Sequence, residues 1–225
     1  MMNTGDGHIY AKNFFTKLNS TSYDKIVKLT TFGQDFYWKR KMLKKITTRG
    51  PVLELACGTG ILSSLLKDSG YSVYGIDLTF DYLKILRSKN LKYFCVNGTA
   101  VSLPFKDNYF DCIISSYLPK YCDIDKLASE CFRVLKHGGI AILHDFILPH
   151  RKLFRVFWNS YFKILKFSGR FVKNWAKVFN DLDSLIILSN WYDSLPKNFI
   201  DKGFIDVTSE TFTFETVAMI SAKKP

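Results

Sequence analysis

A pair of glycines and a pair of acidic residues, set at short and defined distances, form the part of this chain most suited to chemistry. The segment Pro51-Val-Leu-Glu-Leu-Ala-Cys-Gly-Thr-Gly-Ile-Leu62 combines an apolar run with a glycine turn. Asp77 closes a second apolar run about 20 residues after that turn, where a carboxylate binds ribose hydroxyls in nucleotide folds. Gly58 and Gly60 let the backbone turn sharply and approach a ligand closely. The spacing predicts a site for an adenosine-containing cofactor.

The glycine pattern excludes a dinucleotide. The third glycine of G-x-G-x-x-G falls at Ser63, so the helix cannot approach as closely as a pyrophosphate site requires. The apolar run Val52 to Leu55 suits a strand buried on both faces, and a helix follows from Ile61 to near Gly70. Strand, turn, helix and second strand together predict an α/β, Rossmann-like fold.

Four ordered segments resemble one enzyme family. The pattern E-x-A-C-G-T-G, followed by Gly75-Ile-Asp77, is similar to motifs I and II of the class I S-adenosylmethionine (SAM) methyltransferases. Two further segments resemble later parts of that family: Gly98-Thr-Ala-Val-Ser-Leu-Pro-Phe-Lys-Asp-Asn-Tyr-Phe-Asp-Cys-Ile-Ile-Ser-Ser116 and Arg133-Val-Leu-Lys-His-Gly-Gly139. The resemblance implies SAM as cofactor and S-adenosylhomocysteine as product.

The same resemblance implies which residues bind the cofactor. The turn after the first strand wraps the methionine portion, Asp77 meets the ribose, and a position in the third segment meets the adenine. That last position is usually acidic and is Thr99 here, for which altered affinity rather than loss of binding is expected. The expected cofactor residues are Glu54, Ala56, Cys57, Gly58, Thr59, Gly60, Asp77, Leu78, Thr99, Ala100 and Ser116.

We expect a seven-stranded, mostly parallel sheet that ends in an antiparallel hairpin, as the methyltransferase resemblance implies. The remaining parallel strands are predicted at 92–96, 111–116 and 139–145, with a helix at 124–136, and the hairpin at 203–208 and 213–223. We expect residues 1–48 to form a helical arm interrupted at Gly33, and residues 49–225 to form the SAM-binding domain. A helical lid is expected at about 147–192.

A narrower resemblance concerns the substrate. Tyr23-Asp24, Phe32-Gly33 and Trp38-Lys-Arg40 resemble the Y-D, F-G and W-[RK]-[RK] pattern of the subgroup that C-methylates ubiquinone and menaquinone precursors. The subgroup's Arg-Asn pair after the fourth strand is replaced by Lys120-Tyr121, which puts the quinone substrate in doubt more than the methyltransferase activity.

Candidate catalytic residues follow the strand ends beside the pocket. A carbon nucleophile on a hydroquinone ring needs a base near its hydroxyl. The candidates are Asp145, His144 and Tyr23, together with Ser116 and Tyr117 after the fourth strand. A structural role is the alternative for each of the first two: a hydrogen-bond acceptor for Asp145 and a core histidine for His144. The four histidines and the absence of clustered ligands give a metal site no support.

The lid segment is basic and aromatic. Eight basic residues and no acidic one occur from Arg151 to Lys177, interleaved with Phe, Trp and Tyr, in two predicted helices separated at Ser168-Gly169. Such a segment can lie in the headgroup plane of an anionic bilayer, bind nucleic acid, or pack on its own domain with solvated lysines. The absence of an Asn/Asp-Pro-Pro-Tyr/Phe motif weighs against methylation of a base's amino group.

Composition bounds the remaining possibilities. The net charge of +12 favours anionic partners without choosing among them. The five cysteines form no C-x-x-C pair, and the chain has neither a signal-peptide pattern nor a membrane-spanning apolar run. We therefore expect a cytoplasmic protein, with peripheral contact at the inner face of the membrane through residues 151–177 as one interpretation of the lid.

The sequence favours a SAM-dependent methyltransferase acting on a small, lipophilic aromatic molecule such as a quinone precursor. A methyltransferase of RNA or protein is the alternative within that class, motivated by the charge. A non-catalytic protein that binds SAM or nucleic acid is the alternative outside it, motivated by Thr99 and Lys120-Tyr121. The oligomeric state is not predicted.

Overall fold

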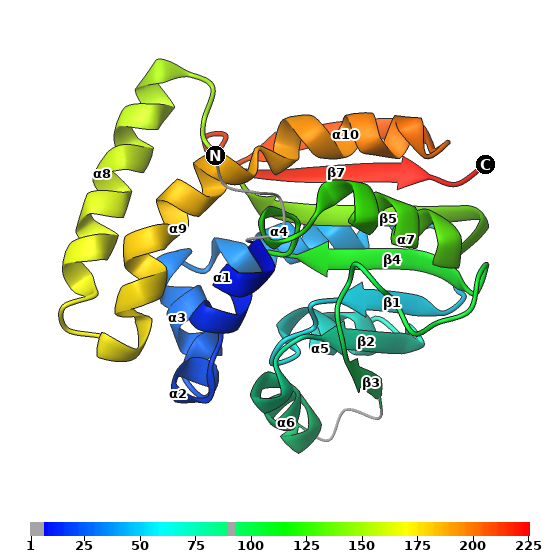
Figure 1. The fold of residues 1–225 in the computed structure, drawn as a ribbon, viewed down its shortest axis with the longest axis horizontal. Coiled ribbons are helices and arrows are strands. Elements are labelled where there is room, and N and C mark those ends of the chain that lie inside the picture. Colours follow the sequence, from blue (N-terminus) through cyan, green and yellow to red (C-terminus); the bar gives the residue numbers. More distant parts are fainter. Residues whose placement is uncertain (1–6, 90–92) are drawn as a thin grey trace.

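One mixed sheet organises the molecule. The structure is a computed structural model that describes residues 7–89 and 93–225. Within those residues seven strands form a sheet in the order β3-β2-β1-β4-β5-β7-β6 (Figure 1). The strands are β1 (Val52–Leu55), β2 (Val73–Asp77), β3 (Phe94–Asn97), β4 (Phe110–Ser116), β5 (Leu135–Phe146), β6 (Ile205–Phe212) and β7 (Val217–Lys223). β7 runs antiparallel to both β5 and β6, while the other pairs are parallel. The expected sheet with its C-terminal antiparallel hairpin is confirmed.

The central strands are apolar on both faces because helices cover both. Alternate residues of β4 and β5 point to opposite faces: Ile113 and Leu143 pack with α7 (Ile124–Val134) and α10 (Trp191–Asp201), while Ile114 and Ile142 pack with the other side. That second face is covered by α4 (Gln34–Leu43) and α5 (Ile61–Asp68), and α6 (Phe80–Ser88) packs beside the glycine turn. This arrangement explains why the strands read as nearly continuous apolar runs.

The N-terminal arm is more broken than predicted. In the described part of the chain it consists of α1 (Gly7–Phe14), α2 (Lys17–Ser20), α3 (Tyr23–Thr30) and α4. The break at Gly33 is as expected, since φ is +74° there. An additional break precedes α2, where the buried Asn19 side chain donates to Phe14 O at 2.6 Å and accepts from Thr16 N at 3.0 Å. These bonds satisfy backbone groups that a continuous helix would use itself.

The segment predicted to form a lid contains α8 (Lys152–Ser168) and α9 (Ala176–Ser189), joined through a short 3-10 turn at Lys173–Trp175. The predicted break at Ser168-Gly169 is present, but the second helix begins only at Ala176. Ala176 packs 3.2 Å from where a Cβ on Gly169 would lie, so the chain turns back tightly at this glycine. In Figure 1 the lid and the arm gather at the same end of the sheet, where β1 and β4 end.

Several predicted boundaries need correction or restriction. β5 begins at 135 rather than 139, and the hairpin turn lies at 213–216, because β6 continues past 208 to 212. The helix predicted to reach Lys136 ends at Val134, because Leu135 already pairs with Phe110 in the sheet. Lys92, the first residue of a predicted strand, lies outside the described residues, as do residues 1–6 of the predicted arm.

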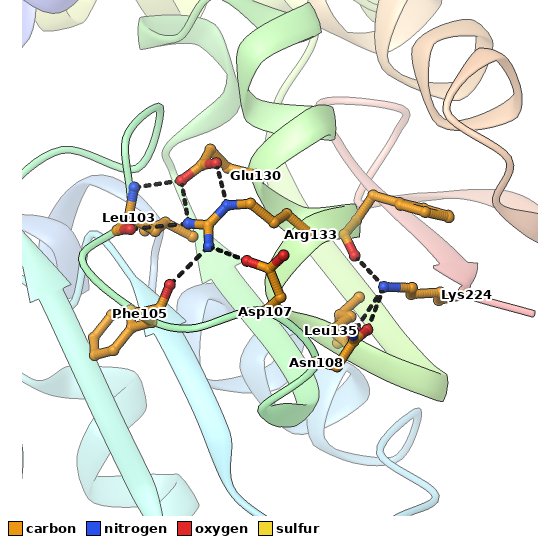
Figure 2. A network of polar contacts seen from close by, with 9 residues as sticks. Leu103, Phe105, Asp107, Asn108, Glu130, Arg133, Leu135 and Lys224 are labelled. Atoms are coloured by element: carbon orange, nitrogen blue, oxygen red, sulfur yellow. Dashed lines mark hydrogen bonds and ion pairs between the residues drawn. The ribbon is translucent and has the colours of Figure 1, made fainter.

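A charged network joins α7 to the loop between β3 and β4 (Figure 2). The Arg133 guanidinium donates to both Glu130 oxygens at 2.7 and 2.8 Å, to Asp107 at 2.7 Å, and to the carbonyls of Phe105 and Leu103. Glu130 also accepts from the backbone amide of Leu103. The Arg of the R-V-L-K segment therefore holds the loop that follows Thr99 and Ala100.

Lys224, near the C-terminal end of the chain, forms hydrogen bonds with the loop before β4 and with the end of α7. Its ammonium donates to Asn108 Oδ1 at 2.7 Å and to the carbonyls of Phe132 at 2.7 Å and Leu135 at 2.9 Å (Figure 2). These carbonyls belong to the end of α7, where a helix leaves acceptors without intrahelical partners. The C-terminal cation thus stabilises this helix end.

We predict that Glu130→Gln lowers the free energy of unfolding by about 2 kcal/mol at pH 7, the scale of a hydrogen bond to a charged group. Hydrogen bonds from Arg133 lower the pKa of Glu130, so the stabilisation is complete above the ordinary glutamate pKa of about 4.3 and is lost as pH falls below it. Chemical denaturation at pH 7 and pH 3 measures both effects. Lys126→Gln, which removes an exposed ion pair of 3.9 Å, is the control and should change little. An equal loss at both pH values would contradict the assignment.

Candidate active site

The candidate site lies where the parallel strands end. β1 is flanked by β2 on one side and β4 on the other, because strands before and after this point are added on opposite sides of β1. Ligands of open α/β sheets bind beside such a topological switch point. Two cavities are found at this edge. A narrow one of about 90 Å³ adjoins the glycine turn, and a larger one of about 360 Å³ lies between the arm and the lid. Phe15, Tyr23, Tyr117 and Tyr121 line both, so the cavities are neighbours.

Asp77 is the main charged group of the narrow cavity. It is the last residue of β2, it is buried, and its oxygens accept from Gly58 N at 2.7 Å and Thr79 N at 2.8 Å. Burial raises its pKa to about 6, while the two backbone bonds oppose the shift. Each oxygen keeps a lone pair for a further donor. Such a carboxylate suits the hydroxyls of a ribose.

Seven of the residues expected to bind cofactor line this cavity: Ala56, Gly58, Asp77, Leu78, Thr99, Ala100 and Ser116. Ala56 has φ +53° and Gly58 φ +54°, so the turn after β1 bends in the left-handed region. This conformation brings the backbone of the turn to the cavity wall. Thr99 lies on that wall as well, and its hydroxyl accepts weakly from Val101 N at 3.4 Å.

Four of the expected cofactor residues do not line this cavity: Glu54 near the end of β1 and Cys57, Thr59 and Gly60 in the turn. Ser63 Oγ donates to Glu54 at 2.5 Å. Ser63 stands where the third glycine of G-x-G-x-x-G would be, and its side chain forms a buried hydrogen bond here. Burial raises the pKa of Glu54 to about 8, and it raises the pKa of Cys57 well above the ordinary thiol value, which argues against a reactive thiolate. Gly60 has φ +88°, a backbone conformation that strains a residue with a side chain and therefore favours glycine.

The arm closes the narrow cavity from outside. Thr59 donates to Asp24 of α3, Asp24 also pairs with Lys89 at 2.7 Å, and Tyr82 donates to Asn19 at 2.8 Å. A small-molecule pocket has a volume of roughly 300–1,000 Å³, and the narrow cavity is smaller than this range. The residues that face the cavity nonetheless suit an adenosine: a carboxylate, an exposed glycine backbone and the apolar Ile76, Leu78 and Ala100.

The larger cavity has an almost wholly apolar wall. Its floor is formed by Tyr117, Lys120, Tyr121 and Phe146, and the turn between β6 and β7 closes one side. The helical walls come from α3, α8 and α9 and consist of Ile26, Val27, Phe154, Phe157, Trp158, Tyr161, Phe162, Leu165, Val178, Phe179 and Leu182. A hydrophobic molecule fits this lining, with Lys120 supplying charge at the bottom.

Asp145 forms a buried ion pair rather than facing a cavity. Its Oδ1 accepts from Lys120 Nζ at 2.5 Å and from Phe146 N at 2.7 Å, and its Oδ2 accepts from Lys120 N at 3.2 Å. Burial raises the pKa of Asp145 and lowers that of Lys120, and their mutual attraction opposes both shifts. Lys120 lines the larger cavity, while Asp145 lines neither. The geometry assigns Asp145 contacts with Lys120 and the backbone.

His144 is also buried behind the wall. Its Nδ1 lies 3.1 Å from Ser116 Oγ, and within the described residues its buried Nε2 has no partner. Burial, together with the charges of Lys39 and Lys120, lowers the pKa of His144 well below its ordinary value, so the ring is neutral. Tyr23, the third candidate, lines both cavities.

Sequence reasoning missed Asp35 and the role of Lys39. Both lie on α4, form an ion pair one helical turn apart, and are almost fully buried. Lys39 donates to Ser116 Oγ at 3.2 Å, and Asp35 accepts from the Tyr117 hydroxyl at 2.7 Å. In the sequence, Lys39 belongs only to the W-K-R pattern, and Asp35 belongs to none of the motifs that predict the site. Opposite charges at i and i+4 on a predicted helix indicate an ion pair, and this spacing was the signal in the sequence that could have identified them.

The described residues contain no candidate metal site. Across residues 7–89 and 93–225, no group of three or more His, Cys, Asp and Glu side chains has the geometry to hold an ion.

Comparisons with known proteins agree with this geometry. The chain is 31% identical over 216 residues to the ubiquinone/menaquinone biosynthesis C-methyltransferase UbiE of Pseudoalteromonas translucida, covering 89% of this chain and 85% of that protein. It is 28% identical over 213 residues to the demethylmenaquinone methyltransferase of Thermus thermophilus, covering 90% and 96%.

A solved structure shows the same fold. Phosphoethanolamine N-methyltransferase 2 of Haemonchus contortus, in complex with S-adenosyl-L-methionine, superposes with a TM-score of 0.69 at 17% identity. The superposition covers 100% of this chain, which spans 60% of the length of that protein.

The sheet order, the glycine turn after β1 and the carboxylate that ends β2 define a class I SAM-dependent methyltransferase. The model of the ubiE/COQ5 methyltransferase family matches residues 1–224. The chain belongs to that family and uses SAM as its methyl donor.

We predict that Asp77→Asn weakens binding of S-adenosylhomocysteine by about 10- to 100-fold, the cost of losing a charged hydrogen-bond acceptor. Because the pKa of Asp77 is about 6, wild-type affinity should also fall as pH drops through 6 and the carboxylate gains a proton. Calorimetric titration at pH 5 and pH 8 measures both. Asp81→Asn, in the first turn of α6, is the control and should bind normally. Unchanged affinity in Asp77→Asn would refute the assignment.

Proposed function

We propose that this protein transfers the methyl group of SAM to a ring carbon of a reduced, prenylated quinone precursor. The observation that carries the proposal is the apolar cavity of about 360 Å³ directly beside the narrow cavity of the glycine turn. A volume of this size suits a small molecule. The two relatives are a demethylmenaquinone methyltransferase and a ubiquinone/menaquinone biosynthesis C-methyltransferase, which supports the same class of acceptor.

The cofactor residues are proposed from the cavity lining. Asp77 is placed to bind the ribose, the Ala56 to Gly58 turn to face the methionine portion, and Thr99 with Ala100 to border the adenine. The other expected residues would stabilise the conformation of the turn without contacting the cofactor: Glu54, Cys57, Thr59 and Gly60. When bound, SAM supplies an electrophilic methyl group, and the protein has to align the acceptor and exclude water.

The larger cavity supports a lipophilic acceptor over RNA or protein. Its wall consists mainly of aromatic and aliphatic side chains, which match a lipophilic molecule better than the polar edge of an RNA base. A quinol ring beside Tyr117 and Lys120 would have polar groups for its oxygens, while its prenyl chain follows Trp158, Phe162 and Phe179 outward. Four residues line both cavities and would border acceptor and donor where the two meet: Phe15, Tyr23, Tyr117 and Tyr121.

We propose a matching division of the chain. Residues 1–48 act as an arm over the cofactor, residues 49–225 as the methyltransferase domain, and residues 147–192 as its lid over the acceptor. The supporting contacts join arm to lid across the larger cavity: Tyr161 donates to Thr30 O at 2.9 Å, and Trp175 donates to Ser22 Oγ at 2.9 Å.

Turnover of a short-chain demethylmenaquinol with labelled SAM tests the activity. We expect a labelled methyl group on a ring carbon of the reduced acceptor, and none on the oxidised quinone, whose ring is electron-poor. Mass spectrometry of the product locates the methyl group. Transfer to tRNA or to a protein fraction, with none to the quinol, would overturn the proposed function.

The finer part of the proposal is contact between the lid and an anionic bilayer. Helix α8 presents a stripe of apolar side chains to the outside, each more than half exposed: Leu153, Val156, Phe157, Ile164 and Phe167. A second exposed stripe beside it carries Lys152, Arg155 and Lys163. Apolar and basic stripes side by side are typical of helices that lie in a membrane interface. Among the described residues, no helix combines the length and apolarity needed to cross a bilayer.

The mouth of the larger cavity opens on the same surface. Phe32, Phe157 and Phe214 line the cavity and are also 80%, 64% and 69% exposed. An acceptor dissolved in lipid would therefore reach the cavity without crossing water. This continuity favours a peripheral position on the membrane, which for a cytoplasmic protein is its inner face.

We predict that vesicles with anionic lipid bind the protein more tightly than neutral vesicles do. Replacing Lys152, Arg155 and Lys163 together by Gln should weaken binding by roughly 100-fold, since each basic residue near the surface contributes about 1 kcal/mol. Cosedimentation measures this. A control that replaces Lys106, Lys126 and Lys197, three exposed lysines outside the lid, removes equal charge and should bind far better. Equal loss in both triple variants would leave the lid without a membrane role.

A further inference from the structure

Tyr117 has a backbone conformation that a tyrosine rarely adopts. It follows β4 directly with φ +68°. The conformation is held from several sides: Tyr117 N donates to His144 O at 2.7 Å, Lys120 Nζ donates to Tyr117 O at 3.2 Å, and the ring stacks on Phe146 at 4.8 Å. Strain of this kind persists where surrounding contacts enforce it, often at functional sites. Here it directs the phenol into the wall shared by the two cavities.

The Tyr117 hydroxyl is hydrogen-bonded to a buried carboxylate. It donates to Asp35 Oδ1 at 2.7 Å, and the same oxygen is paired with Lys39. Lys39 is held in turn by Ser116, and the side chains of Asp35 and Lys39 are 7% and 3% exposed. The ammonium compensates the charge of the carboxylate in a place where an unpaired charge would be costly. The phenol oxygen of Tyr117 keeps its lone pairs for a donor from the cavities.

The other polar candidates lack this arrangement. Tyr23 also lines both cavities, but its ring packs edge-on against Phe15 and Tyr82, and within the described residues its hydroxyl bonds to no carboxylate. His144 and Asp145 line neither cavity. Lys120 also joins a cavity to a buried carboxylate, Asp145, but it lines only the larger cavity. Among these groups of the described residues, Tyr117 alone lines both cavities and is bonded to a buried carboxylate.

We propose that Tyr117 is a catalytic residue that accepts the proton of the acceptor's phenolic hydroxyl while passing its own proton to Asp35, with Lys39 as the positioning residue for Asp35. This inference rests on the proposed phenolic acceptor. It names the proton route, which the proposed function leaves open.

The step balances in protons and electrons. The acceptor O–H bond breaks, its proton bonds to the Tyr117 oxygen, and the Tyr117 proton bonds to the Asp35 carboxylate. The ring carbon forms its bond to the methyl group as the methyl–sulfur electron pair remains on sulfur and neutralises the sulfonium charge. The methylated ring then loses its carbon-bound proton to water, and Asp35 returns a proton through Tyr117 to the ring oxygen. One proton is released per turnover.

Tyr117→Phe tests the route with little change in shape. We expect kcat with a short-chain demethylmenaquinol to fall by about 100-fold or more, as for loss of a general base, while affinity for S-adenosylhomocysteine stays within about 2-fold because Asp77 is untouched. Tyr37→Phe is the control, because Tyr37 is an exposed phenol on the same helix as Asp35 and Lys39. It should keep wild-type kcat.

A second acceptor distinguishes proton transfer from packing. A ring-fluorinated demethylmenaquinol that is ionised at the assay pH has no phenolic proton to lose, so the ratio of wild-type to Tyr117→Phe rate should shrink to below about 10-fold. A packing defect would reduce both acceptors alike. The double variant Asp35→Asn/Lys39→Met removes base and counter-charge together, avoids an unpaired buried cation, and should show the same pattern.

The outcomes separate the two proposals. Wild-type turnover of the quinol with Tyr117→Phe at full rate, or with equal losses on both acceptors, overturns the proton route and leaves the proposed function standing. No wild-type turnover of either quinol overturns the proposed function and this inference with it.

Discussion

The rest of the site depends on one buried ion pair. Lys120 and Asp145 have side chains that are 2% and 0% exposed, and their contact ties the turn after β4 to the end of β5. The same ammonium donates to Tyr117 O, so the pair also supports the strained backbone that directs the Tyr117 ring. Removing one partner of such a pair leaves an uncompensated buried charge, which costs about 3–5 kcal/mol. The shape of the wall between the two cavities is therefore coupled to the charge balance beneath it.

The lid shows how one helix meets three demands. The inner face of α8 carries Trp158, Phe162 and Leu165, which are buried against α9. Its outer face carries a basic stripe beside an apolar one. Because 3.6 residues form a turn, 17 residues are enough to display these three faces separately. The proposed membrane contact thus lies on the outer side of α8, while the inner side both packs the helix against α9 and lines the larger cavity with Trp158, Phe162 and Leu165.

The cofactor side of the molecule was largely predictable from local pattern. The apolar runs, the glycine turn and Asp77 specify β1, α5 and β2 because each is encoded within a few consecutive residues. Ser63 was recognised as incompatible with a dinucleotide, but its bond to Glu54 was not predictable, since it depends on how α5 sits against β1. The end of α7 was misplaced for a similar reason. Helix periodicity continues past Val134, and only the pairing of Leu135 with Phe110 ends the helix there.

The sequence by itself determined the class of fold, the cofactor and the family, because short motifs with defined spacing encode a parallel sheet and its nucleotide-binding turn. It also marked the lid as basic and aromatic. Only the tertiary structure decided which polar groups meet. Asp35 and Tyr117 are 82 residues apart and Lys120 and Asp145 are 25 apart, and each pair forms only when α4 and the ends of β4 and β5 converge. Contacts between distant residues are set by packing of whole elements, which no local spacing records.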